Sequence, residues 1–96
     1  MYWRKVTVIM KENWSINLEL DEYVQDRDLL VQDALQAIED TELGCYVNLA
    51  VAENHGHPDA YLLPAIQVRF GEKLQVRFID QCGCGGYVYR VLKVAL

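Results

Sequence analysis

The stretch AIQVRFGEKLQVRFID, residues 65–80, decides the expected fold, because apolar and polar residues alternate through most of it. The apolar residues of its two halves are Ile66, Val68 and Phe70, then Leu74, Val76 and Phe78. Alternation with a period of two is typical of strands with one buried face. A three-residue loop at residues 71–73, or a bulge, places these apolar residues opposite one another, whereas a two-residue turn would pair them with polar residues. The sequence therefore predicts an antiparallel hairpin.

Four further strands and one helix are expected around this hairpin. The expected strands are residues 4–10, 15–20, 45–52 and 87–96. The helix begins at Asp26, whose carboxylate can cap the first turn, and runs to about Asp40. Its expected buried stripe consists of Val31, Ala34, Leu35 and Ile38. Gly44 fits the exit from the helix, and residues 53–59 read as a loop.

The expected fold class is therefore α+β, in a single domain of 96 residues. It comprises a mostly antiparallel sheet of five to six strands with one helix packed on one face. The expected order is two strands, a helix, then three or four strands. This order resembles that of ubiquitin-like β-grasp domains over the first two-thirds of the chain. The resemblance implies a fold and carries no functional motif.

Composition and charge exclude several classes of partner. The formal net charge is −5, and an acidic chain repels phosphate backbones, so nucleic-acid binding is not expected. No apolar run reaches the ~20 residues that span a membrane. The first residues enter an expected strand rather than an export signal, and three cysteines without such a signal do not suggest disulfides. We therefore expect a cytoplasmic protein with no membrane and no nucleic-acid partner.

Two short chelating spacings support one metal-site hypothesis. His55 and His57 lie in one expected loop, and Cys82 and Cys84 lie in another. Two imidazoles and two thiolates are a ligand set for tetrahedral zinc, although structural zinc sites usually separate their cysteines by two to four residues. The simpler interpretation is two turns that happen to contain these residues. The alternative function is a zinc-binding or small-ligand protein with its site between residues 55–59 and 82–86.

Enzymatic roles are less favoured by the sequence. The usual redox motif places two residues between its cysteines and opens a helix, whereas Cys82 and Cys84 are separated by one residue and precede a strand. A nucleophile–base pair between these cysteines and the histidines needs a geometry that spacing does not supply. We assign no catalytic residue, and no cofactor apart from the zinc of the hypothesis above. Cys45 is interpreted as a core residue.

Aromatic residues support the leading function. The candidate interface residues are Trp3, Trp14, Tyr87, Tyr89 and Val91. Tyr and Trp are enriched at interface centres, and packing at the edge of a small core is the simpler interpretation. One helix covers one face of a sheet, yet the strand at residues 87–96 carries apolar residues on both faces. We therefore predict a small protein-interaction module that forms a homodimer through its sheet, with another protein as a further partner.

Overall fold

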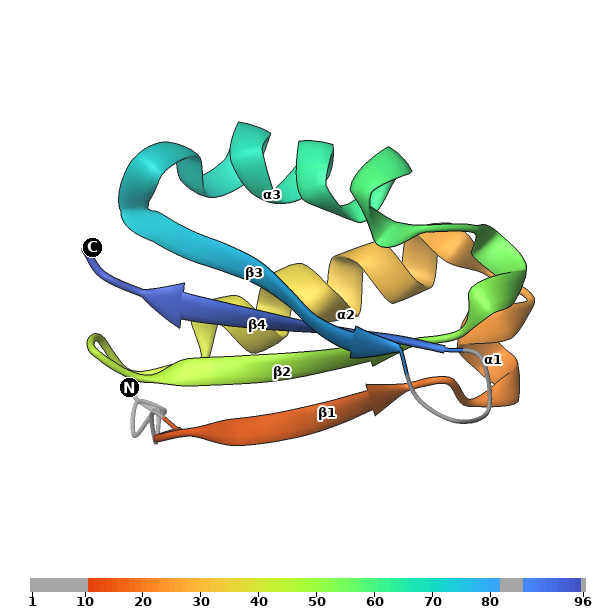
Figure 1. The fold of residues 1–96 in the computed structure, drawn as a ribbon, viewed down its shortest axis with the longest axis horizontal. Coiled ribbons are helices and arrows are strands. Elements are labelled where there is room, and N and C mark those ends of the chain that lie inside the picture. Colours follow the sequence, from red (N-terminus) through yellow and green to blue (C-terminus); the bar gives the residue numbers. More distant parts are fainter. Residues whose placement is uncertain (1–10, 82–85, 96) are drawn as a thin grey trace, which may run out of the picture.

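Two helices cover one face of a four-stranded mixed sheet (Figure 1). The computed structural model describes residues 11–81 and 86–95. The strands are β1 Trp14–Leu18, β2 Tyr46–Val51, β3 Leu74–Gln81 and β4 Tyr87–Lys93. The helices are α1 Asp21–Val24, α2 Arg27–Glu39 and α3 Leu62–Phe70, and the 3-10 turns are η1 Glu53–His55, η2 Pro58–Ala60 and η3 Gly71–Lys73. The strand order is β1-β2-β4-β3, with β1 parallel to β2 and the other neighbours antiparallel.

The predicted helix at residues 26–40 is confirmed as α2. The Asp26 carboxylate accepts a hydrogen bond of 3.1 Å from the backbone N–H of Leu29, as a capping residue should. Ala34 and Ile38 of the expected stripe are buried, and Leu30 and Ala37 join them. The buried face is wider than predicted because α3 packs against α2 in addition to the sheet.

The first half of the predicted hairpin is wrong, because residues 62–70 form helix α3. Leu62 and Ile66 are buried at the i, i+4 spacing of a helix, whereas Val68 is 89% exposed. Pro64 lies in the first helical turn, where its missing N–H removes no hydrogen bond. Gly71 ends the helix with a φ of 61°, which a residue without a Cβ adopts readily.

The expected sheet of five to six mostly antiparallel strands with one helix is therefore wrong in detail. The described residues form four strands with one parallel pair and three α-helices, and only the α+β class is retained. The observed order of elements differs from that of β-grasp domains, so this resemblance is wrong. The predicted strand at residues 4–10 lies outside the described residues. The strand predicted at residues 15–20 appears as β1, which pairs in parallel with β2 across the α2 crossover.

The core lies between the sheet and the two longer helices. Its buried apolar residues are Leu18, Leu30, Ala34, Ala37, Ile38, Val47, Leu49, Val51, Leu62, Ile66, Tyr89 and Val91. Cys45 is half-buried at the margin of this core, and Gly44 has the positive φ of 87° expected at its turn. Among the described residues, no helix is long and apolar enough to cross a bilayer.

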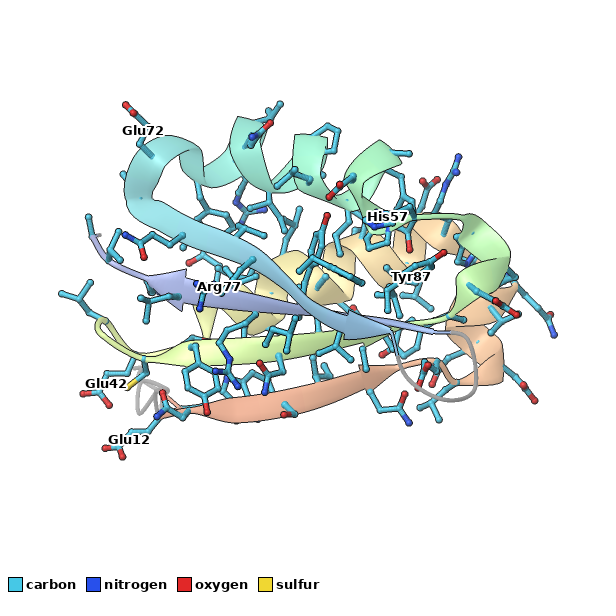
Figure 2. The ribbon with its side chains drawn as sticks, in the orientation of Figure 1. Glu12, Glu42, His57, Glu72, Arg77 and Tyr87 are labelled. Atoms are coloured by element: carbon cyan, nitrogen blue, oxygen red, sulfur yellow. The ribbon has the colours of Figure 1, made fainter. Side chains whose placement is uncertain are left out.

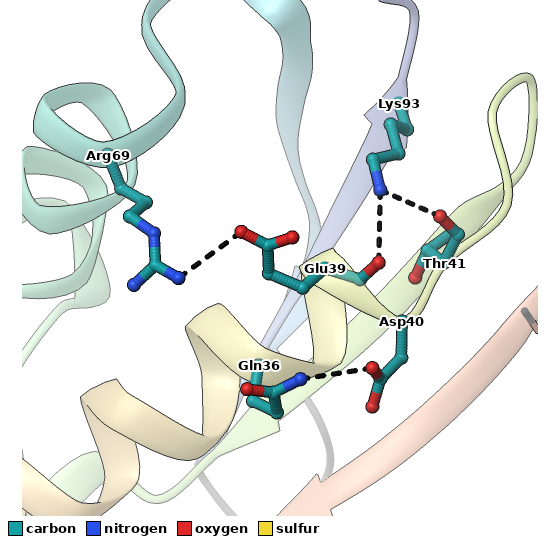
Figure 3. Close-up of polar contacts among 6 residues, drawn as sticks. All are labelled: Gln36, Glu39, Asp40, Thr41, Arg69 and Lys93. Atoms are coloured by element: carbon teal, nitrogen blue, oxygen red, sulfur yellow. Dashed lines mark hydrogen bonds and ion pairs between the residues drawn. The ribbon is translucent and has the colours of Figure 1, made fainter. Parts of the chain in front are cut away.

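A buried lysine on β4 explains why that strand looked unusual in sequence. Lys93 is only 6% exposed, and its Nζ donates hydrogen bonds to the carbonyl oxygens of Glu39 (3.1 Å) and Thr41 (3.0 Å) (Figure 3). These carbonyls lie at the C-terminal end of α2, where a positive charge is favourable. The neighbouring Arg69 on α3 donates to the Glu39 carboxylate at 3.2 Å. Lys93 thus belongs to the face that the helices cover.

Candidate functional site

Four aromatic rings lie close together near the C-terminal end of β3 and the N-terminal end of β4, which are neighbours in the sheet. His57, which begins η2, lies 4.8 Å from Tyr87 and 5.3 Å from Phe78 between ring centres (Figure 2). Phe78 pairs across the strands with Tyr89, at 6.4 Å between rings. We call these four residues the aromatic cluster. Their tilted and edge-to-face arrangements are those that aromatic rings prefer.

The two histidines of the metal hypothesis have separate roles in the described structure. His55 Nε2 lies 2.8 Å from the backbone oxygen of Tyr23, to which it donates as the Nε2–H tautomer. His57 Nδ1 instead accepts a hydrogen bond of 3.1 Å from the backbone N–H of Asp59. Each ring is thus held by a different segment of backbone. Among the described residues, no group of three or more histidine, cysteine or acidic side chains could hold a metal.

Cys82 and Cys84 lie outside the described residues, so their distance from the histidines is not fixed. The four-residue zinc site therefore stays a prediction, and elemental analysis of untagged protein with and without chelator tests it. The structure does fix the two ends of the segment that carries the cysteines. Gln81 at the end of β3 pairs with Tyr87 at the start of β4, so the two residues that flank segment 82–86 are neighbours in the sheet.

Two buried tyrosine hydroxyls lie in this part of the molecule without a hydrogen-bond partner among the described residues. They belong to Tyr61 and Tyr89. The Tyr61 ring packs edge-on against His55 at 5.9 Å, and the Arg27 guanidinium lies 5.6 Å from its centre. Burial raises the pKa of Tyr61 above its ordinary value, against an opposing effect of Arg27. The Tyr61 phenol is therefore neutral at physiological pH.

The four predicted interface residues that the structure describes differ in how deeply they are buried. Tyr89 and Val91 are buried within the chain beneath the helices, at 2% and 0% exposure. Tyr87 is half-buried in the aromatic cluster, and Trp14 is half-buried with its Nε1 donating to Thr41 Oγ1 at 3.0 Å. Trp3 lies outside the described residues. Self-association through the sheet stays a prediction, which sedimentation velocity at micromolar concentration tests.

Sequence reasoning missed a hollow on the sheet face that the described helices leave uncovered. Its volume is about 470 Å³, and it is lined by Tyr46, Gln75, Val76, Arg77, Arg90 and Leu92. We call it the arginine hollow. Its one sequence signal is Arg90, which lies between Val88 and Leu92 on an otherwise apolar strand face.

Comparison with known protein families was made on the whole chain. The model of a family described as "Putative radical SAM target protein" matches residues 4–94. The chain belongs to this family. No curated protein and no solved structure matches the chain significantly. The part matched to the radical SAM target family includes every described helix and strand, the aromatic cluster and segment 82–86.

Proposed function

We propose that this chain is the protein substrate of a radical SAM enzyme, and that residues 82–86 are the part of the chain that is modified. The observation that carries the proposal is the family match over residues 4–94, which spans the whole described fold. The chain is then a protein-interaction module in a specific sense, because its partner is the enzyme that modifies it. The fold supplies a rigid body that the enzyme can recognise.

The pairing of Gln81 with Tyr87 supports this role. It holds the two residues that flank segment 82–86 next to each other on β3 and β4, and the Tyr87 ring packs against His57 in the aromatic cluster. An enzyme that binds the sheet would therefore recognise flanking residues that the fold already holds in place, which removes part of the entropic cost of binding.

The composition of the segment suits radical chemistry. It reads CGCGG over residues 82–86, with two thiols alternating with glycines. Radical SAM enzymes produce a 5′-deoxyadenosyl radical at an iron–sulfur cluster. That radical can take a hydrogen atom from a glycine Cα, where no side chain obstructs the approach.

Sulfur of a neighbouring cysteine can then bond to the carbon radical. The thiol hydrogen leaves as a proton, and the remaining electron returns to the enzyme's cluster. The deoxyadenosyl group leaves as 5′-deoxyadenosine with the hydrogen that it took. Each sulfur–carbon cross-link thus removes two hydrogen atoms from the protein.

Mass spectrometry tests the proposal directly. The protein is purified after co-expression with the radical SAM enzymes of its source genome, one at a time, and its intact mass is compared with the mass expected from the sequence. We expect a loss of two hydrogen atoms per cross-link, located by tandem mass spectrometry between Gln81 and Tyr87. Cys82→Ser with Cys84→Ser should abolish the change. Cys45→Ser is the matched control, because this half-buried thiol lies outside the segment and should leave the modification intact.

Two results would overturn the proposal. An unchanged mass with every such enzyme, each shown to cleave S-adenosylmethionine, would contradict the substrate role. A modification that persists in the double cysteine variant would keep the substrate role and contradict its location.

A further inference from the structure

The arginine hollow is lined by two arginines that lie opposite each other on adjacent strands. Arg77 on β3 pairs directly across from Arg90 on β4 (Figure 2 labels Arg77). Like charges directly opposite one another on a sheet are unfavourable. No described carboxylate forms an ion pair with either side chain. The pair therefore forms a local positive charge on a chain whose net charge is −5.

The two arginines differ in how they are held. The Arg90 guanidinium lies 4.0 Å from the centre of the Tyr46 ring, and its Nε donates a hydrogen bond of 3.0 Å to Asn48 Oδ1. These contacts fix its direction, and its terminal nitrogens form no hydrogen bond with the described part of the chain. Arg77 is exposed and has no hydrogen bond with any described residue. One guanidinium that is held in place and one that can reorient can together bind an anion from two sides.

The walls of the hollow indicate what kind of anion fits. Tyr46 and Leu92 are half-buried and offer apolar surface, while Gln75 offers an amide at the open side. A carboxylate on a short apolar stem matches this combination, because the stem can lie on the ring and on Leu92 while both oxygens meet the guanidiniums. A bare phosphate would leave the apolar walls without a partner.

We infer that the arginine hollow binds a carboxylate side chain delivered by an acidic peptide segment of a partner protein. A peptide is favoured over a free small acid because Gln75 and Arg77 are exposed, so that a small ligand would remain largely in water. A peptide gains further contacts along the same face, where Ala50 and Val88 are half-exposed neighbours of the hollow. This inference does not depend on the proposed modification, because it concerns different residues.

Titration with matched peptides tests the inference. The probe is a blocked peptide of three glutamates flanked by glycines, and its control carries glutamines instead. In nitrogen–proton spectra of the ¹⁵N-labelled protein, we expect the glutamate peptide to shift the Arg90 Nε–H signal and the amides of Tyr46 and Leu92. Arg77→Gln should weaken binding about tenfold, as expected for the loss of one charge-assisted contact.

The variants include a matched control for loss of charge. Arg69→Gln removes one guanidinium from α3, on the helix-covered side, and should leave peptide affinity unchanged. Arg77→Lys keeps the charge without the planar fork and should bind with intermediate affinity.

Three results would overturn the inference. They are equal shifts with the glutamine peptide, equal affinity of the Arg77→Gln and Arg69→Gln variants, and binding of succinate or inorganic phosphate as tight as that of the glutamate peptide. The last result would assign the hollow to a small anion instead of a peptide.

Discussion

The Tyr23 hydroxyl donates a hydrogen bond of 2.7 Å to Asp33 Oδ2, which ties the short helix α1 to the middle of α2. This hydrogen bond, followed by burial and by the negative charge of the same carboxylate, raises the pKa of Tyr23 from 10.0 to about 12. The neutral phenol is therefore the form that the fold selects. Since a group with a raised pKa stabilises the fold below its unfolded pKa, this contribution is present below pH 10.0 and lost as the pH rises through about 12.

Substitution of Asp33 should reveal how far its carboxylate raises the pKa of Tyr23. In Asp33→Asn, we expect the pKa of Tyr23 to fall toward 10.0, because the carboxylate that accepts the hydrogen bond and repels the phenolate is gone. The ring-carbon NMR shift of Tyr23, followed against pH, measures it. Asp28→Asn on the first turn of the same helix is the control and should leave the titration unchanged. An unshifted titration in Asp33→Asn would contradict the assignment.

Lys93→Met should destabilise the protein by about 1–3 kcal/mol, because two buried carbonyl acceptors at the end of α2 lose their donor. Methionine keeps most of the apolar stem, so the loss reports the ammonium group. Urea denaturation gives the free energy of unfolding. Lys73→Met, at an exposed position on η3, is the control and should change it by less than about 0.5 kcal/mol. Equal effects of the two substitutions would show that the buried contacts contribute nothing.

The hydroxyls of Tyr89 and Tyr23 should respond in opposite ways to removal. Tyr89→Phe deletes a buried hydroxyl with no partner among the described residues, so stability should hold or rise by up to about 1 kcal/mol. Tyr23→Phe deletes a hydroxyl that donates to a carboxylate and should cost about 1 kcal/mol. Thermal unfolding of both variants at neutral pH makes the comparison. A clear loss in Tyr89→Phe would mean that its hydroxyl has a partner.

Substitutions in α3 discriminate the helix from the strand predicted there. Val68→Lys should leave the free energy of unfolding within about 0.5 kcal/mol, because the side chain is 89% exposed. Ile66→Ala should cost about 2–5 kcal/mol, because that side chain is fully packed. A strand with both residues on its buried face would make both changes costly. Chemical denaturation of the two variants decides between these outcomes.

Local signals were sufficient for α2 and insufficient for α3. Asp26 is followed by an apolar stripe long enough to exclude a strand, so cap and periodicity agreed. In residues 65–70 the alternation of Ile66, Val68 and Phe70 fits a strand, yet the helical stripe begins earlier, at Leu62. Six residues are too few to distinguish the two periods. Pro64 does not distinguish them either, because proline suits the entry to a strand and the first turn of a helix equally well.

The candidate sites depend on pairings that a single sequence does not contain. Arg77 and Arg90 become neighbours only through the register in which β3 pairs with β4. β4 lies in the middle of the sheet because it also pairs with β2. The His57 ring packs against Tyr87 because the segment at η2 lies next to that end of the sheet. The prediction grouped histidines and cysteines by ligand chemistry, whereas the described histidines are oriented by backbone groups and aromatic rings.

The position of β4 would also affect the timing of the proposed modification. It lies between β2 and β3 although it follows both in the chain, so the four-stranded sheet cannot be complete until residues 87–93 leave the ribosome. A maturation enzyme that reads the assembled sheet would thus ignore nascent polypeptide. It would act only on chains that have completed translation through this strand.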